Sequence, residues 1–202
     1  MKTLIAVPCM DNVAAPFAQS LATIKNVGDC IVSFNIGSLI YDARNQLTKQ
    51  AISLKADYIL WLDSDMMFPS DIMDKMIKHM EDGKDIVTGL YFRRRSPFTP
   101  VLFKTLEETT HEDYLDYPKD TLFEVAGCGF GACMTRVETM EDIALNSHDF
   151  FTPFNGYGED LAFCLRAKQN GYKIWCDSTI KCAHIGQVIV DEAIYQSSIR
   201  EA

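Results

Sequence analysis

Residues 58–65 read Tyr58-Ile59-Leu60-Trp61-Leu62-Asp63-Ser64-Asp65, which is five apolar residues followed by two carboxylates one residue apart. A short apolar run of this kind is typical of a buried strand. Beyond Pro69, Ser70 or Asp71 can cap a helix whose apolar residues recur at helical spacing until Gly83. The stretch therefore predicts a strand, an acidic turn and a helix.

The same order of strand and helix precedes this stretch twice. Residues 2–7 and 30–36 are apolar and strand-like, and residues 17–24 and 40–55 carry apolar side chains at helical spacing. Residues 85–92 resemble a fourth strand. Successive strand-helix units build a mostly parallel α/β sheet, in which ligands bind beyond the carboxyl ends of the strands. We therefore expect both aspartates at the ligand-binding edge of a Rossmann-like sheet.

The second half of the chain follows a different pattern. Prolines and acidic residues interrupt residues 93–120, which we interpret as an acceptor-side insertion. The elements expected beyond it are strands at 123–126, 132–137 and 172–176 and a helix at 161–169. They predict a mixed, partly antiparallel extension of the sheet. Residues 188–202 fit a helix and a mobile tail equally well.

Composition sets the broad class of the protein. We expect one domain over residues 1–202, with a nucleotide-binding half over about 1–92, an acceptor and catalytic half over about 93–187 and a tail over 188–202. The net charge of −9 works against nonspecific binding to nucleic acid. A core of this size needs no disulfides, so the seven cysteines are expected to be reduced. The first apolar run stops at Pro8 and no membrane span follows, which predicts a cytoplasmic protein.

The paired aspartates are the strongest chemical signal. Because the turn after a strand breaks its alternation, Asp63 and Asp65 can both face one cleft. Two carboxylates form a hard-oxygen site that suits Mg²⁺ or Mn²⁺ together with waters and substrate phosphates. The alternative is that they cap the following helix or its loop. Their position at the ligand-binding edge favours the metal site.

At this point the sequence resembles a known family. The run from Trp61 to Asp65 matches the motif of GT-A glycosyltransferases, a hydrophobic strand followed by Asp-x-Asp, and residues 158–166 resemble their later Glu-Asp segment with its helix. Residues 43–45 and 177–184 are similar as well, in particular to short, family-2-like enzymes of bacteria and phages. The resemblance covers nearly the whole chain. It implies a GT-A fold and transfer of a sugar from a nucleotide-diphosphate sugar, with a UDP-sugar as the expected donor, to a hydroxyl acceptor.

The resemblance also implies a donor site. It puts Pro8, Cys9 and Arg44 by the nucleotide. Both aspartates, with Ser64 between them, would hold Mn²⁺ or Mg²⁺ on the donor diphosphate. Such an ion neutralises the charge that develops on the leaving nucleoside diphosphate.

His184 and Asp160 gain roles from the same resemblance. A lone histidine is by default a core or surface residue, but many GT-A enzymes bring a C-terminal histidine to the metal, which makes His184 a candidate ligand. Asp160 starts a predicted helix and could simply complement its dipole. In inverting members of the family the matching acidic residue removes the proton of the acceptor hydroxyl. Glu159 is the alternative base.

The glycines between the two later strands admit two interpretations. Gly127, Gly129 and Gly131 let backbone amides approach a sugar, or they mark a bulge or tight bend. Nearby cysteines and His184 suggest zinc, but the chain has no Cys-x-x-Cys pair, so free thiols are expected instead.

Other functions stay open at this stage. Nucleotidyl transfer to a sugar phosphate is disfavoured because residues 8–15 lack a glycine-rich, basic loop. A non-catalytic protein that binds sugar nucleotides is disfavoured by the intact acidic motifs. The acceptor is a glycan, a lipid-linked sugar or a modified nucleic-acid base, and oligomerisation is left open. The basic run Arg93-Arg94-Arg95 is either solvated or contacts an anionic acceptor or a donor phosphate.

Overall fold

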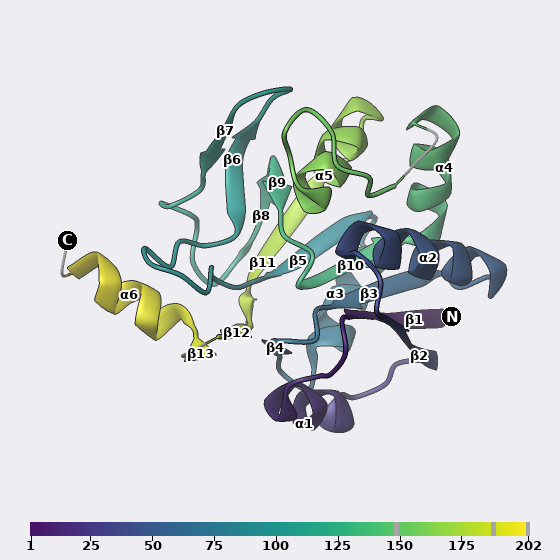
Figure 1. Ribbon diagram of the computed structural model, residues 1–202, viewed down its shortest axis with the longest axis horizontal. Coiled ribbons are helices and arrows are strands. Elements are labelled where there is room, and N and C mark those ends of the chain that lie inside the picture. The colour runs from purple at the N-terminus through teal and green to yellow at the C-terminus, as the bar shows by residue number, and fades with distance from the viewer. Residues whose placement is uncertain (148–149, 187–188, 201–202) are drawn as a thin grey trace.

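The apolar runs form the central strands of a large sheet in the computed structural model, which describes residues 1–147, 150–186 and 189–200 (Figure 1). Within these residues the sheet has seven strands, in the order β2-β1-β3-β10-β5-β11-β8. In that order they span Asp29–Ile36, Lys2–Cys9, Tyr58–Leu62, Ala132–Arg136, Ile86–Leu90, Ile174–Lys181 and Leu122–Val125. Strand β1 is parallel to β2 and β3, and β11 is parallel to β5, whereas β10 and β8 are antiparallel to their neighbours. The expected mostly parallel α/β sheet with a mixed second half is confirmed.

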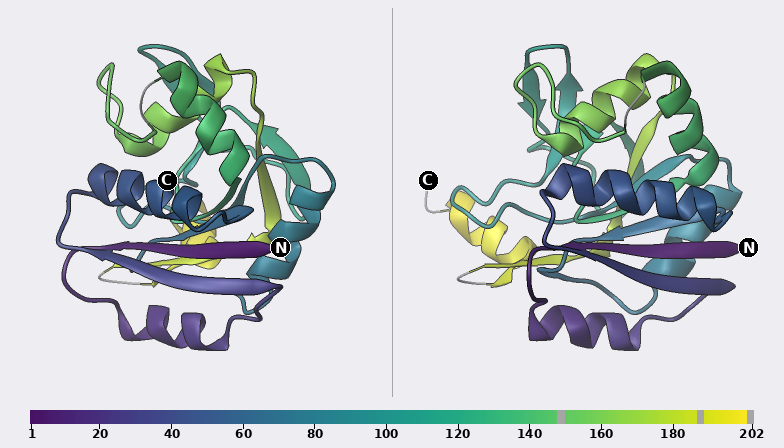
Figure 2. Two further views of the ribbon diagram at one scale, coloured as in Figure 1. Left: turned by 90° about the vertical axis from the view of Figure 1, so that its right-hand side faces the viewer. Right: turned by 45° about the vertical axis from the view of Figure 1, so that its right-hand side comes forward.

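Helices cover both faces of this sheet. On one face lie α2 (Ile40–Ser53), α4 (Val137–Ser147) and α5 (Glu159–Gln169), and on the other lie α1 (Ala15–Thr23) and α3 (Ile72–Glu81). Figure 2 shows α2 and α1 on opposite sides of β1 and β2. Each face has its own apolar core, which explains why every residue of β3 is buried and why its sequence is continuously apolar.

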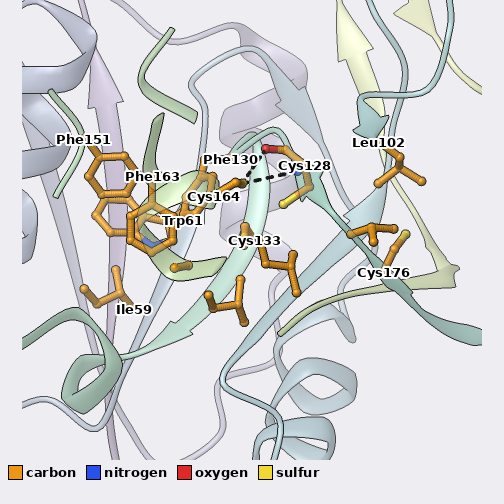
Figure 3. Packing of buried hydrophobic residues seen from close by; sticks show 14 of the residues in the cluster. Ile59, Trp61, Leu102, Cys128, Phe130, Cys133, Phe151, Phe163, Cys164 and Cys176 are labelled. Carbon is orange, nitrogen blue, oxygen red and sulfur yellow. Dashed lines mark hydrogen bonds between the residues drawn. The ribbon is translucent and has the colours of Figure 1, made fainter. Parts of the chain in front are cut away.

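The core under α2 and α5 is rich in aromatic rings. Trp61 of β3 packs edge-on against Phe130 and Phe151, and Phe151 stacks on Phe163 with ring centroids 4.8 Å apart (Figure 3). Such pairs add specific geometry to the burial of large apolar surfaces. They fix the segments around Phe130 and Phe151 beside the carboxyl end of β3.

One expected detail of α3 is wrong. Asp71 occupies the N-cap position, but its side chain makes no capping hydrogen bond and lies 3.1 Å from the ammonium of Lys75 instead. The helix is held by its buried apolar face, which follows the predicted spacing, and by the turn that ends at Gly83. Gly83 has a φ of +81°, which favours glycine.

The second half adds elements that the sequence pattern did not specify. Residues 93–120 carry β6 (Leu102–Leu106) and β7 (His111–Asp113), which form a small sheet with β9 (Gly127–Cys128). The strand expected to reach Val137 ends one residue earlier, and α4 starts there. The apolar residues of α4 face the core at helical spacing.

The C-terminal stretch forms part of the structure. A further small sheet joins β4 (Met66–Met67), β12 (Ala183–Ile185) and β13 (Ile189–Val190), and α6 (Glu192–Arg200) follows it. The helical alternative for residues 188–202 is therefore correct over α6, whereas Val188 and residues 201 and 202 lie outside the described residues. All seven cysteines are free, as expected. Across the described ranges, no helix is long and apolar enough to span a bilayer.

Candidate functional site

A cavity of about 480 Å³ opens beyond the carboxyl ends of β1 and β3, where a parallel sheet binds its ligands. Six of the predicted site residues line it: Pro8, Cys9, Asp63, Ser64, Asp65 and His184. The other lining residues are Met10, Asp11, Asn12, Ser38, Ile40, Ala43 and Arg94. The fold thus gathers residues from the ends of three strands, the start of α2, the loop with Arg94 and the later strand β12 around one cavity.

Arg44 is buried behind this cavity and does not line it. Its side chain is 1% exposed, and Nη2 lies 3.0 Å from Oδ1 of Asp63 and 3.4 Å from Oδ1 of Asp160. Nε lies 3.8 Å from Oε1 of Glu159. Burial lowers the pKa of Arg44, but the three carboxylates together raise it above its usual value. One buried guanidinium therefore balances three carboxylates.

Aromatic rings enclose the same guanidinium. The rings of Trp61, Phe130 and Phe151 lie 5.7 to 6.0 Å from its central carbon, and Nη1 donates a 3.5 Å hydrogen bond to the carbonyl of Phe130. Cations over aromatic faces are attracted by the ring quadrupole. These contacts hold Arg44 in one position, so Asp63 and Asp160 are held as well.

Asp160 lies in the first turn of α5 with an unusual environment. Burial raises its pKa to about 7; Glu159 and Asp63 act in the same direction, and Arg44 acts in the opposite one. Its Oδ1 atom is buried and makes no hydrogen bond with the described residues, and its 3.4 Å contact with Nη2 of Arg44 is an ion pair. A carboxyl group with this pKa can exchange a proton near neutral pH.

Asp65 faces a different set of groups from Asp63. Its Oδ2 atom lies 2.5 Å from Nη1 of Arg94 and 3.5 Å from Nε2 of His184. Burial tends to raise the pKa of Asp65, but His184 and Arg94 lower it below its usual value. The side chain is 28% exposed, so solvent and ligands reach it.

Backbone pairing brings His184 to this position. Strand β12 pairs with β4, with His184 opposite Met66, and the N–H of Ile185 donates a 2.7 Å hydrogen bond to the carbonyl of Asp65. The imidazole Nδ1 donates to the carbonyl of Phe92 at 3.0 Å. Because Nδ1 donates to this carbonyl, Nε2 is the ring nitrogen that faces Asp65.

This pair fits a divalent cation that a substrate helps to bind. In the part of the chain that the structure describes, no three His, Cys, Asp or Glu side chains are grouped so that they could hold an ion by themselves. Mg²⁺ is usually held by one or two carboxylates together with substrate phosphates, and Mn²⁺ also accepts imidazole nitrogen. Asp65 and His184 supply one oxygen and one nitrogen, which suits such a shared site.

The glycine segment packs against protein rather than opening into the cavity. Gly131 donates its N–H to the hydroxyl of Tyr91 at 3.0 Å, and Gly129 donates to the carbonyl of Val101 at 3.2 Å. A Cβ at Gly129 would lie 1.9 Å from the same hydroxyl, so the close approach of Tyr91 requires glycine here. A Cβ at Gly127 would be less crowded, at 3.1 Å from Cδ2 of Leu161. A role for Gly127 or Gly129 toward a sugar stays a prediction.

Several lining residues were absent from the sequence prediction. Asp11 and Asn12 follow the end of β1, and Ser38 follows the end of β2. The rule that placed Asp63 at a strand end could have found them, because they also lie at carboxyl ends of parallel strands. Arg94 was singled out only as part of a basic run.

Comparisons with known proteins point to one family and fold. The family model described as "Glycosyl transferase family 2" matches residues 17–143, more than half of the chain. The crystal structure of A197 from STIV is similar with a TM-score of 0.69 and 21% identity, over 92% of this chain and 86% of that one. No curated protein matches the sequence.

A second similar protein is larger. The crystal structure of S. aureus TarS 1–349 is similar with a TM-score of 0.52 and 14% identity, over 89% of this chain and 61% of that one. The same TarS segment in complex with UDP-GlcNAc gives a TM-score of 0.54 and 16% identity, over 87% of this chain and 56% of that one. The chain thus spans about three fifths of the TarS segment, and at these identities the similarity shows the shared fold.

Proposed function

The chain belongs to glycosyl transferase family 2, and from that premise we propose that it moves a sugar from a UDP-sugar to a hydroxyl acceptor, with metal assistance and inversion. Membership of the family makes it a glycosyltransferase. The observation that carries the finer proposal is the meeting of Asp63, Asp65 and His184 at one cavity, with Asp160 linked to it through Arg44. The UDP-GlcNAc complex of TarS supports the choice of a nucleotide-sugar donor.

The donor's nucleoside would lie over the ends of β1 and β2. Pro8 and Cys9 end β1, and Asp11, Asn12 and Ser38 add polar groups to the same wall of the cavity. A few polar groups in a partly apolar cavity are what fixes the orientation of a small ligand. This position points the diphosphate toward the turn that carries Asp65.

Asp65 and His184 are the residues that would hold Mn²⁺ or Mg²⁺. Both line the cavity, and the hydrogen bond from His184 to the carbonyl of Phe92 orients the ring with Nε2 toward Asp65. When bound, the ion stabilises negative charge on the departing diphosphate. Asp63 is engaged by Arg44, and we assign it to the wall of the site beside the ion.

Asp160 is proposed as the general base. It accepts the proton of the acceptor hydroxyl while the hydroxyl oxygen bonds to the anomeric carbon, and the bond from that carbon to the phosphate oxygen breaks. UDP leaves on the face opposite to attack, so the anomeric configuration inverts. A pKa of about 7 suits this task, because a base is most effective when its pKa is near the operating pH.

Arg44 is proposed as a positioning residue for the carboxylates. It is 1% exposed and does not line the cavity, so a direct contact with the nucleotide is not supported by its position. Its guanidinium holds Asp63 and Asp160 through the same nitrogen and opposes the burial that raises the pKa of Asp160. Arg44 would thereby keep a fraction of Asp160 ionised at neutral pH.

A donor-turnover assay tests the proposal. The protein is incubated with a panel of UDP-sugars and Mn²⁺, and the released UDP is measured. In a parallel assay it is incubated with UTP, a sugar phosphate and Mn²⁺, and the released pyrophosphate is measured. We expect UDP release that needs Mn²⁺ and is lost in Asp65→Ala, with the melting temperature of the variant unchanged. Pyrophosphate release would favour nucleotidyl transfer, and tight sugar-nucleotide binding without turnover would favour a binding protein.

A further inference from the structure

The three arginines of the run at 93–95 have different surroundings. Arg93 lies 2.8 Å from Asp113 and 5.9 Å from the ring of Phe103, so it ties the segment to β6 and β7. Arg95 is exposed and forms no ion pair with any residue that the structure describes. Arg94 lines the donor cavity and lies 2.5 Å from Oδ2 of Asp65. The run is therefore neither uniformly solvated nor uniformly bound.

Arg94 occupies the place where a cation on Asp65 would lie. Its Nη1 contacts the same carboxylate oxygen that faces Nε2 of His184. The carboxylate attracts a positive group, and in this structure the guanidinium of Arg94 supplies it. A divalent ion bound to Oδ2 of Asp65 and Nε2 of His184 would therefore compete with this contact of Arg94.

The contact is weak enough to exchange. The side chain of Arg94 is 51% exposed and that of Asp65 is 28% exposed, and ion pairs in such surroundings contribute about 0 to 1 kcal/mol. Arg44, by contrast, is enclosed by aromatic rings and cannot leave its carboxylates without burying uncompensated charge. Of the two arginines that contact the Asp63-Ser64-Asp65 turn, Arg94 is therefore the one that is weakly held.

The donor offers Arg94 a second partner. Among the described residues that line the cavity, Arg94 carries the one guanidinium or ammonium group, whereas Asp11, Asp63 and Asp65 contribute carboxylates. A diphosphate in this cavity needs positive charge, and guanidinium binds phosphate oxygens through paired hydrogen bonds.

We propose that Arg94 is an exchangeable counter-ion of the donor site. It neutralises Asp65 while the site is empty, yields this carboxylate to the divalent ion, and then binds the donor diphosphate. The inference rests on the metal site of the proposed function. It assigns to Arg94 a role in ordering the arrival of metal and donor, in addition to a contact with substrate.

The exchange predicts opposite effects of one substitution on two ligands. In Arg94→Ala, Mn²⁺ alone should bind about two- to fivefold more tightly, because it no longer competes with an ion pair of this kind. UDP in the presence of saturating Mn²⁺ should bind about tenfold or more weakly, the scale of a lost hydrogen bond to a charged group. Arg94→Lys keeps the charge but lacks the paired hydrogen bonds. Its affinity for UDP should therefore lie between those of the wild type and Arg94→Ala.

Two titrations test this. The free Mn²⁺ signal in electron paramagnetic resonance reports Mn²⁺ binding without nucleotide, and calorimetry reports UDP binding. Arg95→Ala is the matched control, because it removes the same charge from the same loop, and it should leave the Mn²⁺ affinity as in the wild type. An equal Mn²⁺ affinity for Arg94→Ala and wild type, with binding lost in Asp65→Ala, would overturn the exchange alone. Undiminished Mn²⁺ binding by Asp65→Ala would overturn the metal site of the proposed function and the exchange with it.

Discussion

Two arginines neutralise the two aspartates of the turn after β3, and they do so in opposite surroundings. Arg44 is 1% exposed, enclosed by aromatic rings, and in contact with Asp63 and Asp160. Arg94 is 51% exposed and contacts Asp65 across the open cavity. In the first region a charge is fixed, so it can set the position and the pKa of a base. In the second region a charge is exchangeable, so it can give way to ligands.

The largest effect should come from removing the buried guanidinium of Arg44. Arg44→Met keeps much of the apolar stem but leaves Asp63, Glu159 and Asp160 without their shared cation. Removing one partner of a buried ion pair costs about 3 to 5 kcal/mol, because the remaining charge is uncompensated. Urea unfolding should therefore show a loss of this size.

Arg94→Met is the matched control for that experiment. It makes the same substitution on the exposed side, where an ion pair contributes about 1 kcal/mol or less. If the two variants lost equal stability, the distinction between a fixed and an exchangeable arginine would fail.

The next effect concerns Asp160, the proposed base, which Arg44 contacts. Asp160→Asn should bind UDP normally and lose turnover by about 10²-fold or more, because the amide keeps the shape but cannot accept a proton. Turnover is measured together with calorimetric UDP affinity. Glu159→Gln, one residue away on the same helix, should retain most activity; if it loses more than Asp160→Asn, the base is Glu159.

The same carboxyl group predicts a pH dependence. The pKa of Asp160 is raised to about 7 by burial, so below that pH the proton is bound and the base form is lost. We expect kcat/KM to fall about tenfold per pH unit below it, since only the ionised form acts as base. Saturating Mn²⁺ keeps proton competition at the metal site out of the measurement. A flat profile down to the ordinary pKa of a carboxyl group would contradict the assignment.

The sequence predicted the positions of β1, β2, β3 and β5 well, because buried parallel strands are apolar runs and β3 is buried along its whole length. It also predicted the carboxyl ends as the ligand edge, which brought Asp65 and Pro8 to one cavity. The sequence analysis does not predict α4, although Val137, Met140 and Ile143 have helical spacing. The strand that it predicts at 132–137 includes the first residue of this helix.

The arginine contacts could be predicted less well. Arg44 shares a helix face with Leu47 and Ala51, which signals burial. Its partners, however, come from the turn after β3 and from α5, which is more than a hundred residues later. The contact of Arg94 with Asp65 depends on a loop conformation that no local pattern encodes. Hydrophobic periodicity reports which face is buried, whereas long-range ion pairs depend on the assembled fold.

The smallest effect is expected on the exposed side of the comparison, at His184, which faces Asp65. His184→Ala removes one proposed ligand while Asp65 and the donor diphosphate still bind the ion, so we expect the Mn²⁺ activation midpoint to rise by less than about tenfold, or 1.4 kcal/mol. Maximal activity at saturating Mn²⁺ should be largely kept. His79→Ala is the control, because His79 contacts Asp177 at 2.8 Å and does not line the cavity, so it should leave the activation curve unchanged. His184 also packs edge-on against Tyr91, so melting temperatures are compared to separate a loss of packing from a loss of ligation. Identical Mn²⁺ curves for His184→Ala and wild type would leave the ion to Asp65 and the donor, and His184 would then serve the packing of Tyr91 alone.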